Sequence, residues 1–286
     1  MHNVGMGAVR VILFTVACLI CIPVHVLFIS VFYIALGFIN IEWFDKLESL
    51  LYNNLLFIVG TFVACGKYKV TIIGDDIETI RLEKTLILSN HQSTADVPLF
   101  MYIFTEHYRD ISKQIMWIME GLFKFVPFGW VSLWHSDHFL SKKDTIPNIE
   151  KHLIKSYRLD RKWYIVFPEG GFFYKHYESN KRYAFRNNLP VLENVILPRT
   201  GCLSGILKNE KIKWIVDLTV IYTPETPSFY DMISASKEGN IIIVVKKINI
   251  EDVQKSIDSE IFKTNISNLT NKMRKNLSIN LSIAKK

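Results

Sequence analysis

Apolar residues dominate the N-terminal part of the chain, in runs long enough to form membrane helices. Residues 11–40 contain no Asp, Glu, Lys or Arg, which exceeds the roughly 20 residues that a helix needs to cross a bilayer. Pro23 interrupts this run and predicts either one kinked, tilted span or the tip of a re-entrant hairpin. Residues 49–66 form a shorter run with two asparagines, either a second span or an interfacial helix. We expect residues 1–66 to form a membrane anchor of one or two apolar helices.

The charges around these runs predict on which side of the membrane the rest of the chain lies. Arg10 precedes the first run, and Lys67 and Lys69 follow the second. The intervening residues 41–48 carry three acidic side chains and one basic side chain. Basic flanks stay on the cytosolic side, so both the N-terminus and the remainder of the chain are expected there. A monotopic hairpin predicts the same side.

From about residue 70 the pattern changes to short apolar runs that alternate with amphipathic stretches. Residues 97–107 and 148–157 predict helices, the first with Asp96 as its N-cap. Strands are predicted for the runs VTIIG, TLILSN, WYIVFP, NVILP, KWIVDLTVIY and NIIIVVKKINI. This alternation indicates the α/β class, and we expect one domain over residues 67–250 with a central mixed sheet flanked by helices. Residues 251–286 are polar and predict a peripheral helical tail.

Composition and charge exclude several classes of protein. Of the 286 residues, 49% are hydrophobic and 21% are charged, which excludes general disorder. Four cysteines are too few for a disulfide scaffold. Cys18 and Cys21 form a Cys-x-x-Cys pair inside an apolar run without a second pair, which argues against a metal or redox site. The net charge is +7. A basic body beside an apolar anchor fits an anionic membrane or phosphorylated substrates, and the absence of nucleic-acid-binding signatures argues against nucleic acid.

The segment Ser-Asn-His-Gln-Ser-Thr-Ala-Asp, residues 89–96, joins a predicted strand to a predicted helix. Functional side chains gather at this edge of α/β folds. If Asp96 accepts a hydrogen bond from one ring nitrogen of His91, it fixes the tautomer and stabilises the imidazolium. The other ring nitrogen can then take a proton from a substrate hydroxyl, which attacks without a Ser or Cys nucleophile. The alternative is that Asp96 only caps the helix and that His91 is an ordinary loop residue.

Two further segments combine a strand end with residues suited to a polar ligand. Residues 165–172 read Ile-Val-Phe-Pro-Glu-Gly-Gly-Phe. Gly170 and Gly171 let backbone amides approach a bound group closely, and Glu169 can bind a polar substrate or hold a neighbouring base. After a later apolar run, the guanidinium of Arg199 can bind phosphate through two hydrogen bonds. The alternative for the Pro-Glu-Gly-Gly segment is that it only forms a tight turn, and the alternative for Arg199 is that it is an ordinary surface residue.

Together these segments resemble the glycerophospholipid acyltransferase superfamily. Asn-His-x-x-x-x-Asp, Phe-Pro-Glu-Gly and a proline-containing strand end occur in that order, and the resemblance covers residues 47–223. The segments NHQSTADV, WIMEGLFKFVPFGWVSLWHSDHF, DRKWYIVFPEGGF and NNLPVLENVILPRTG resemble its lysophosphatidylglycerol acyltransferase branch. The superfamily pattern has an Arg shortly after the glycine that is Gly129 here, whereas this chain offers Lys142 or Lys143.

The resemblance implies an acyl-CoA:lysophospholipid O-acyltransferase. His91 is then the general base on the lysophospholipid hydroxyl, Asp96 orients it, and no acyl-enzyme forms. The residues implied to bind substrate are Asn90, Lys142, Glu169, Gly170, Gly171 and Arg199. The implied partners are acyl-CoA, lysophosphatidylglycerol or a related lysophospholipid, and the lipid bilayer. The resemblance implies neither a cofactor nor a metal ion, and it places the protein in the endoplasmic reticulum membrane with the catalytic domain facing the cytosol.

Two other functions are compatible with the same residues. A thioester or lipid hydrolase would use the pair of His91 and Asp96 to activate water, and would release fatty acid without an acceptor. A non-catalytic lipid-binding protein would bind lipid without turnover. The presence of His91, Asp96, Glu169 and Gly170 together argues against this second alternative.

Overall fold

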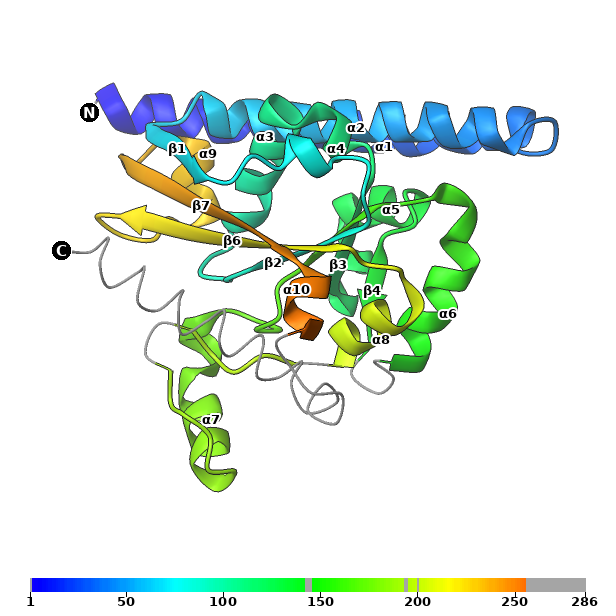
Figure 1. Ribbon diagram of the computed structural model, residues 1–286. Helices are drawn as coiled ribbons and strands as arrows, with labels where there is room; N and C mark the ends of the chain where they lie inside the picture. The colour runs from blue at the N-terminus through cyan, green and yellow to red at the C-terminus, as the bar shows by residue number, and fades with distance from the viewer. Residues whose placement is uncertain (1, 142–145, 193–194, 200, 256–286) are drawn as a thin grey trace.

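Two long N-terminal helices lie antiparallel along one side of the molecule (Figure 1). The computed structural model describes residues 2–141, 146–192, 195–199 and 201–255. Helix α1 spans His2–Leu36 and α2 spans Ile41–Ala64, and both are long and apolar enough to cross a membrane. Pro23 lies inside α1, so the hairpin turns after this helix and not at the proline. Asn40 caps α2 by accepting a hydrogen bond from the Trp43 amide at 3.1 Å.

A seven-stranded sheet forms the centre of the fold, with the strand order β1-β7-β6-β2-β5-β3-β4. The β6–β7 pair is antiparallel and the other pairs are parallel. The sheet is therefore mixed, which confirms the predicted α/β fold class. The strands are β1 Tyr68–Gly74, β2 Thr85–Ser89, β3 Ile115–Glu120, β4 His138–Leu140, β5 Trp163–Val166, β6 Trp214–Thr223 and β7 Gly239–Asn249.

Helices cover both faces of this sheet because its central strands are apolar on both sides. In β2, Ile87 packs into one core cluster, which also contains residues of α2 and α3, whereas Leu86 and Leu88 pack into the other, which contains residues of α6 and α8. The remaining described α-helices are α3 Asp96–His107, α4 Arg109–Ser112, α5 Pro127–Trp134, α6 Ile146–Ser156, α7 Phe173–Arg186, α8 Gly201–Asn209, α9 Phe229–Ser234 and α10 Ile250–Lys255. Short 3-10 helices are η1 Glu78–Ile80, η2 Gly121–Phe125 and η3 Tyr157–Leu159.

Helix α2 packs on α3, which itself lies on the sheet, so the hairpin adds a further layer to this side of the domain. A Cβ at Gly60 would lie 2.8 Å from the Cα of Tyr102, and glycine thus permits the close approach of the two helices. In α1, by contrast, apolar side chains such as Leu19 and Leu27 stay about two-thirds exposed. The hairpin therefore offers an apolar outer face while α2 belongs to the core of the domain.

A buried polar cluster also joins α2 to the domain. His135 Nδ1 lies 3.0 Å from a carboxylate oxygen of Glu48, and the guanidinium of Arg161 forms an ion pair with the same carboxylate at 3.5 Å. Tyr52 stacks on the His135 ring at 3.5 Å between centroids and donates a hydrogen bond to Asp137 at 3.0 Å. All five side chains are at most 5% exposed. Buried charges persist only when they are paired, so this cluster requires α2 to stay docked.

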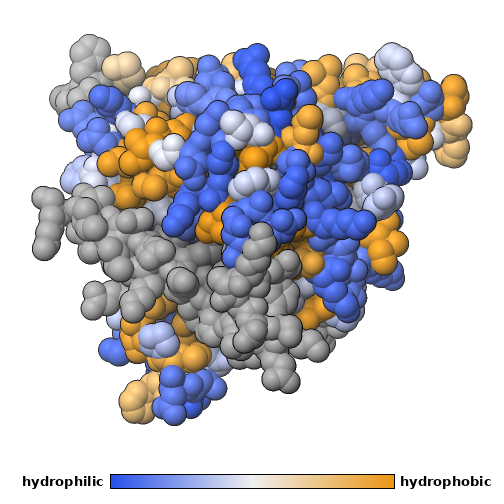
Figure 2. All heavy atoms as spheres, viewed as in Figure 1, coloured by the Kyte–Doolittle hydropathy of each residue, from blue (hydrophilic) through white to orange (hydrophobic). Residues whose placement is uncertain are grey.

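Helix α7 extends away from the body of the domain on the side opposite the hairpin (Figure 1). Its aromatic residues Tyr174, Tyr183 and Phe185 are more than half exposed. Figure 2 shows apolar side chains at the end of the α1–α2 hairpin, where Phe38 is 83% exposed, and on the α7 arm.

Two local predictions from the sequence are wrong. Asp96 is the first residue of α3 and Ala95 is its N-cap, because the Asp96 carboxylate is used elsewhere, as described below. The apolar run 194–198 forms no strand over its described residues. The Ile196 amide donates to the Glu169 side chain and the Leu197 amide donates to the Asn180 side chain, so the backbone has side-chain partners in place of a neighbouring strand.

Two other predictions concern the helix at 148–157 and the C-terminal tail. The helix predicted at 148–157 is α6, which runs from Ile146 to Ser156. In the predicted C-terminal tail, residues 250–255 form α10, and residues 256–286 lie outside the described part of the chain.

Candidate active site

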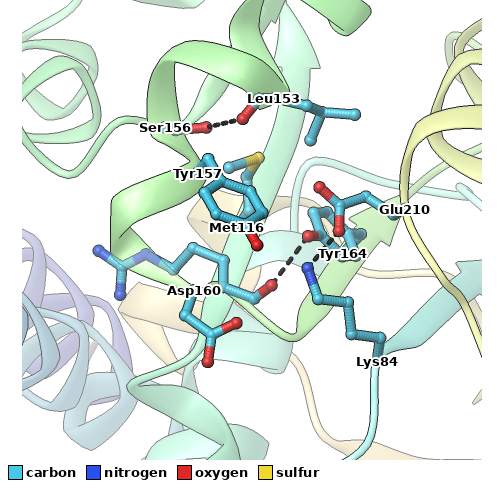
Figure 3. A pocket seen from close by; sticks show the side chains of 9 residues that line it. Lys84, Met116, Leu153, Ser156, Tyr157, Asp160, Tyr164 and Glu210 are labelled. Atoms are coloured by element: carbon cyan, nitrogen blue, oxygen red, sulfur yellow. Dashed lines mark hydrogen bonds and ion pairs between the residues drawn. The ribbon is translucent and has the colours of Figure 1, made fainter.

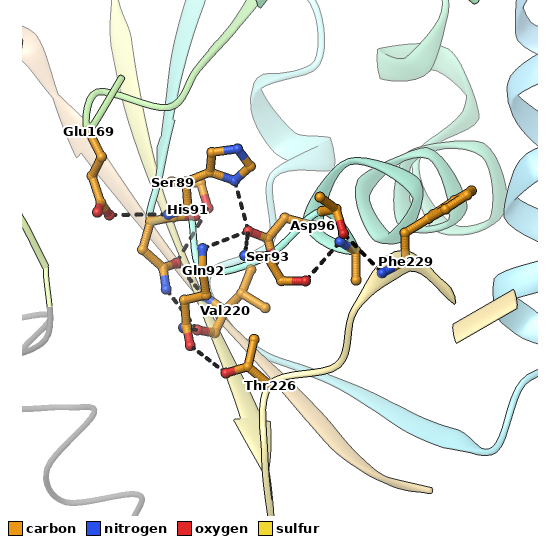
Figure 4. Close-up of polar contacts among 12 residues, drawn as sticks. Ser89, His91, Gln92, Ser93, Asp96, Glu169, Val220, Thr226 and Phe229 are labelled. Carbon is orange, nitrogen blue, oxygen red and sulfur yellow. Dashed lines mark hydrogen bonds and ion pairs between the residues drawn. The ribbon is translucent and has the colours of Figure 1, made fainter. Parts of the chain in front are cut away.

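The loop from β2 to α3 brings His91 and Asp96 together (Figure 4). His91 Nδ1 lies 2.9 Å from Asp96 Oδ2. The same carboxylate oxygen accepts the backbone amides of Gln92 at 2.8 Å and Ser93 at 3.0 Å. Asp96 is completely buried. Three donors on one oxygen hold the carboxylate in a single orientation, and a carboxylate partner assigns the His91 proton to Nδ1.

The second ring nitrogen of His91 points away from Asp96 (Figure 4). The His91 side chain is 14% exposed. Phe167 stacks on its ring at 4.2 Å between centroids, and Phe172 lies against it at 4.4 Å. These aromatic rings fix the plane of the imidazole and reduce its contact with water. Nε2 is consequently available as a proton acceptor at a sheltered position.

Glu169 connects the second sequence segment to the first. One carboxylate oxygen accepts the backbone amide of His91 at 3.1 Å, and the other accepts the amide of Ile196 at 3.5 Å. The residue is 2% exposed. Glu169 therefore ties together three segments that are far apart in the sequence, and its carboxylate fixes the backbone that carries His91.

Gly170 and Gly171 form the turn that follows Glu169, with φ values of +65° and +156°. These values favour glycine. The Arg199 amide donates to the Pro168 carbonyl at 2.8 Å, and a Cβ on Gly170 would lie 2.6 Å from Arg199 Cδ. The exposed Arg199 side chain thus lies directly over Gly170 at the edge of the site.

The substitution Gly170→Ala tests this contact. We expect a loss of about 1–2 kcal/mol in the free energy of unfolding, because a side chain at positive φ is strained. In line with the sequence prediction that Arg199 binds phosphate, we also expect a higher KM for a phosphate-containing substrate, because the new methyl group would displace Arg199. Denaturant unfolding and steady-state kinetics measure the two effects. Gly5→Ala is the matched control, since a Cβ there meets nothing within 4 Å; equal behaviour of the two variants would contradict the assignment.

Asn90 and Lys142 are the other two side chains predicted to bind substrate. Both ends of the Asn90 carboxamide bind β6: Nδ2 donates to the Val220 carbonyl at 2.9 Å, and Oδ1 accepts the Val220 amide at 2.8 Å. Asn90 is 4% exposed, so its side chain connects the end of β2 to β6. Lys142 lies outside the described residues.

Tyr222 on β6 is a member of the site that the sequence analysis missed. Its hydroxyl donates a hydrogen bond to Asp96 Oδ1, the oxygen that faces away from His91. Burial, together with the neighbouring Asp96 charge, raises the pKa of Tyr222 well above its ordinary value. The phenol therefore stays protonated and acts as a donor. A tyrosine hydroxyl near the end of a predicted strand is the signal that the sequence offered.

A small hollow at the other edge of the sheet is separate from this site (Figure 3). Lys84 precedes β2 and Arg161 precedes β5, so the hollow lies at the amino ends of these strands. His91, in contrast, follows the carboxyl end of β2. Lys84 forms an ion pair with Glu210 across the hollow. Within the described residues, no three His, Cys, Asp or Glu side chains converge to hold a metal ion.

Comparisons with known proteins show which family this chain resembles. Residues 70–199 match the family model described as Acyltransferase. The Homo sapiens protein named Acyl-CoA:lysophosphatidylglycerol acyltransferase 1 is 32% identical over 237 residues, which cover 73% of this chain and 64% of that protein. The Caenorhabditis elegans protein named Putative 1-acyl-sn-glycerol-3-phosphate acyltransferase acl-12 is 30% identical over 175 residues, 54% of this chain and 44% of that protein.

A solved structure is similar as well. The crystal structure of the 1-acyl-sn-glycerophosphate (LPA) acyltransferase PlsC from Thermotoga maritima has a TM-score of 0.49 and 15% sequence identity, and the match covers 95% of this chain and 98% of that chain.

The family model and the curated relatives confirm the family resemblance seen in the sequence. The chain belongs to the Acyltransferase family through residues 70–199. It is similar to the human lysophosphatidylglycerol acyltransferase over most of its own length, and it spans 64% of the length of that relative and of its Mus musculus counterpart.

Proposed function

We propose that this protein transfers a fatty acyl chain from acyl-CoA to the free hydroxyl of a lysophospholipid, lysophosphatidylglycerol or a related one. The observation that carries the proposal is the 2.9 Å contact between His91 Nδ1 and Asp96 Oδ2, with the other ring nitrogen turned away from the carboxylate. Membership of the Acyltransferase family and the names of the relatives supply the reaction class and the candidate substrates.

In the proposed reaction His91 acts as the general base. Nε2 accepts the hydroxyl proton while the hydroxyl oxygen attacks the thioester carbonyl. The carbon–sulfur bond then breaks, the new ester remains, and the CoA thiolate takes the proton back from the imidazolium. Asp96 stabilises the imidazolium during this cycle. Because the acceptor hydroxyl itself attacks, no acyl-enzyme forms.

The turn after Glu169 supplies candidates for substrate binding. The Gly170 amide already donates to the Phe167 carbonyl at 3.0 Å, so we assign stabilisation of the thioester oxyanion to the Gly171 amide. Arg199 lies beside this turn and is exposed, and it is our candidate for a substrate phosphate. We retain Lys142 as a second candidate because the pattern of basic residues suits anionic substrates.

The N-terminal hairpin accounts for access to lipid. The outer face of α1 is apolar and exposed, and both helices are long enough to enter a bilayer. The acyl donor and the acceptor both partition into lipid. We propose that the hairpin holds the domain at the endoplasmic reticulum membrane with the catalytic domain on the cytosolic side, as the flanking charges predict.

Labelled acyl-CoA, supplied with and without lysophosphatidylglycerol, tests the proposed reaction. We expect a diacyl product only when the acceptor is present, together with one equivalent of free CoA, both measured by mass spectrometry. Free fatty acid formed at the same rate without acceptor would show a hydrolase. Lipid binding without any turnover would show a non-catalytic protein, and a panel of lysophospholipids with different head groups would identify the preferred acceptor.

A further inference from the structure

We propose that Tyr222 is a positioning residue for the reaction, which acts on His91 through Asp96. This inference rests on the proposed function, because it assigns Tyr222 to the same base. The hydroxyl of Tyr222 donates to Asp96 Oδ1, whereas Oδ2 accepts from the His91 ring and from the amides of Gln92 and Ser93. Among the described residues, Tyr222 is the one hydrogen-bond donor to Oδ1.

The sheet holds Tyr222 at this place. The Val220 backbone binds the side chains of both Asn90 and Gln92, and Gln92 Nε2 donates to the Val220 carbonyl at 2.6 Å. Side chains two residues apart point to the same face of a strand, so Tyr222 and Val220 share the face that packs into the cluster containing α3. In the register between β2 and β6, Ser89 pairs with Leu218. This register sets the position of the Tyr222 phenol along β6 relative to Asp96.

Burial makes this hydrogen bond effective. Asp96 is completely buried and Tyr222 is 4% exposed. Without the phenol hydroxyl, Asp96 Oδ1 would be a buried carboxylate oxygen that lacks a hydrogen-bond donor. The negative charge would then be more concentrated on the carboxylate that faces the imidazole. The Tyr222 hydroxyl thus spreads the carboxylate charge and keeps the plane of the carboxylate fixed for His91.

Few other ionisable groups face Asp96 and His91 among the residues that the structure describes. Tyr68 on β1 interacts electrostatically with Tyr222, and Glu169 contacts the backbone amide of His91. Neither donates to Asp96 in the described part of the structure. The Asp96 carboxylate and the His91 imidazole are therefore the groups whose behaviour should change when the phenol hydroxyl is removed.

The variant Tyr222→Phe tests the inference. We expect a kcat about tenfold lower at an unchanged KM, because one hydrogen bond to a charged group is lost. We also expect the acidic limb of the profile of kcat/KM against pH to move upward by about one pH unit, because the more concentrated Asp96 charge favours the imidazolium. Replacement of Tyr222 by 3-fluorotyrosine, a stronger donor of the same shape, should shift the acidic limb to lower pH.

A second measurement does not depend on activity. Diethyl pyrocarbonate modifies neutral imidazole, so its reaction with His91, followed by mass spectrometry of the peptide, reports protonation of this residue at each pH. The modification curve of Tyr222→Phe should move to higher pH in the same way. If the wild-type protein transfers no acyl group, the proposed function fails while this curve still decides the role of Tyr222.

Tyr164→Phe is the matched control. Tyr164 is also buried on the sheet, 2% exposed, and its hydroxyl donates to the Arg161 carbonyl at 2.8 Å, away from His91. A merely structural phenol lowers stability without moving either pH curve. Two results would show that Tyr222 has no positioning role. In the first, the kcat/KM profile and the His91 modification curve of Tyr222→Phe coincide with those of the wild type and of Tyr164→Phe. In the second, they shift to lower pH.

Discussion

Replacement of His91 with alanine should lower the rate of acyl transfer by about 10²–10⁴-fold while the protein stays folded and bound to membranes, because the proposed reaction loses its general base. The side chain contacts Asp96 at 2.9 Å and the rings of Phe167 and Phe172. Its removal leaves these partners in place. Product formation from labelled acyl-CoA and lysophosphatidylglycerol measures the rate.

The control for this variant is His107→Ala. His107 lies exposed at the end of α3, the helix that begins at Asp96, so its loss removes a similar side chain outside the site. We expect wild-type turnover for this control. Turnover of His91→Ala at the level of the control would remove His91 as the base, even if the protein proved to be an acyltransferase.

Replacement of Glu48 with alanine should lower the free energy of unfolding of the whole domain by about 3–5 kcal/mol, because it leaves buried charge without a partner. Glu48 is on α2, yet its carboxylate faces His135 and Arg161 of the domain. Arg161 is 5% exposed and also donates to the Lys113 carbonyl at 2.7 Å. Denaturant unfolding in detergent micelles measures the change.

Glu42→Ala is the control for this stability effect. Glu42 lies six residues earlier on the same helix and is exposed, so its loss should change stability by less than about 0.5 kcal/mol. An equally small effect for Glu48→Ala would show that the hairpin is a detachable anchor. A large effect would show that the domain does not fold fully without α2.

The local patterns in the sequence were informative where a single segment holds all the interacting atoms. His91 and Asp96 are five positions apart on one loop, and the predicted hydrogen bond is present at 2.9 Å. The alternation of apolar runs also predicted the α/β class, which the mixed sheet confirms. The strand predicted at 194–198 failed because its amides bind the side chains of Glu169 and Asn180, which hydrophobicity does not encode.

Contacts across long sequence separations escaped the sequence analysis. Tyr222 and Asp96 are 126 residues apart, and His135 and Glu48 are 87 residues apart. The hydropathy of residues 49–66 indicated a membrane helix, but α2 also packs against α3 and shares its core. Lipid and a protein core are both apolar surroundings, so hydropathy alone does not distinguish them.

The sequence by itself determined the class of the fold, the apolar N-terminal segment and the three segments that meet at the site. Tertiary structure decided what these segments do to one another: Glu169 holds the backbone of His91, Tyr222 holds the far oxygen of Asp96, and α2 joins the domain through Glu48. The physical reason is that periodicity reports which face of an element is buried, whereas the partner of a buried polar group depends on how the sheet and helices pack.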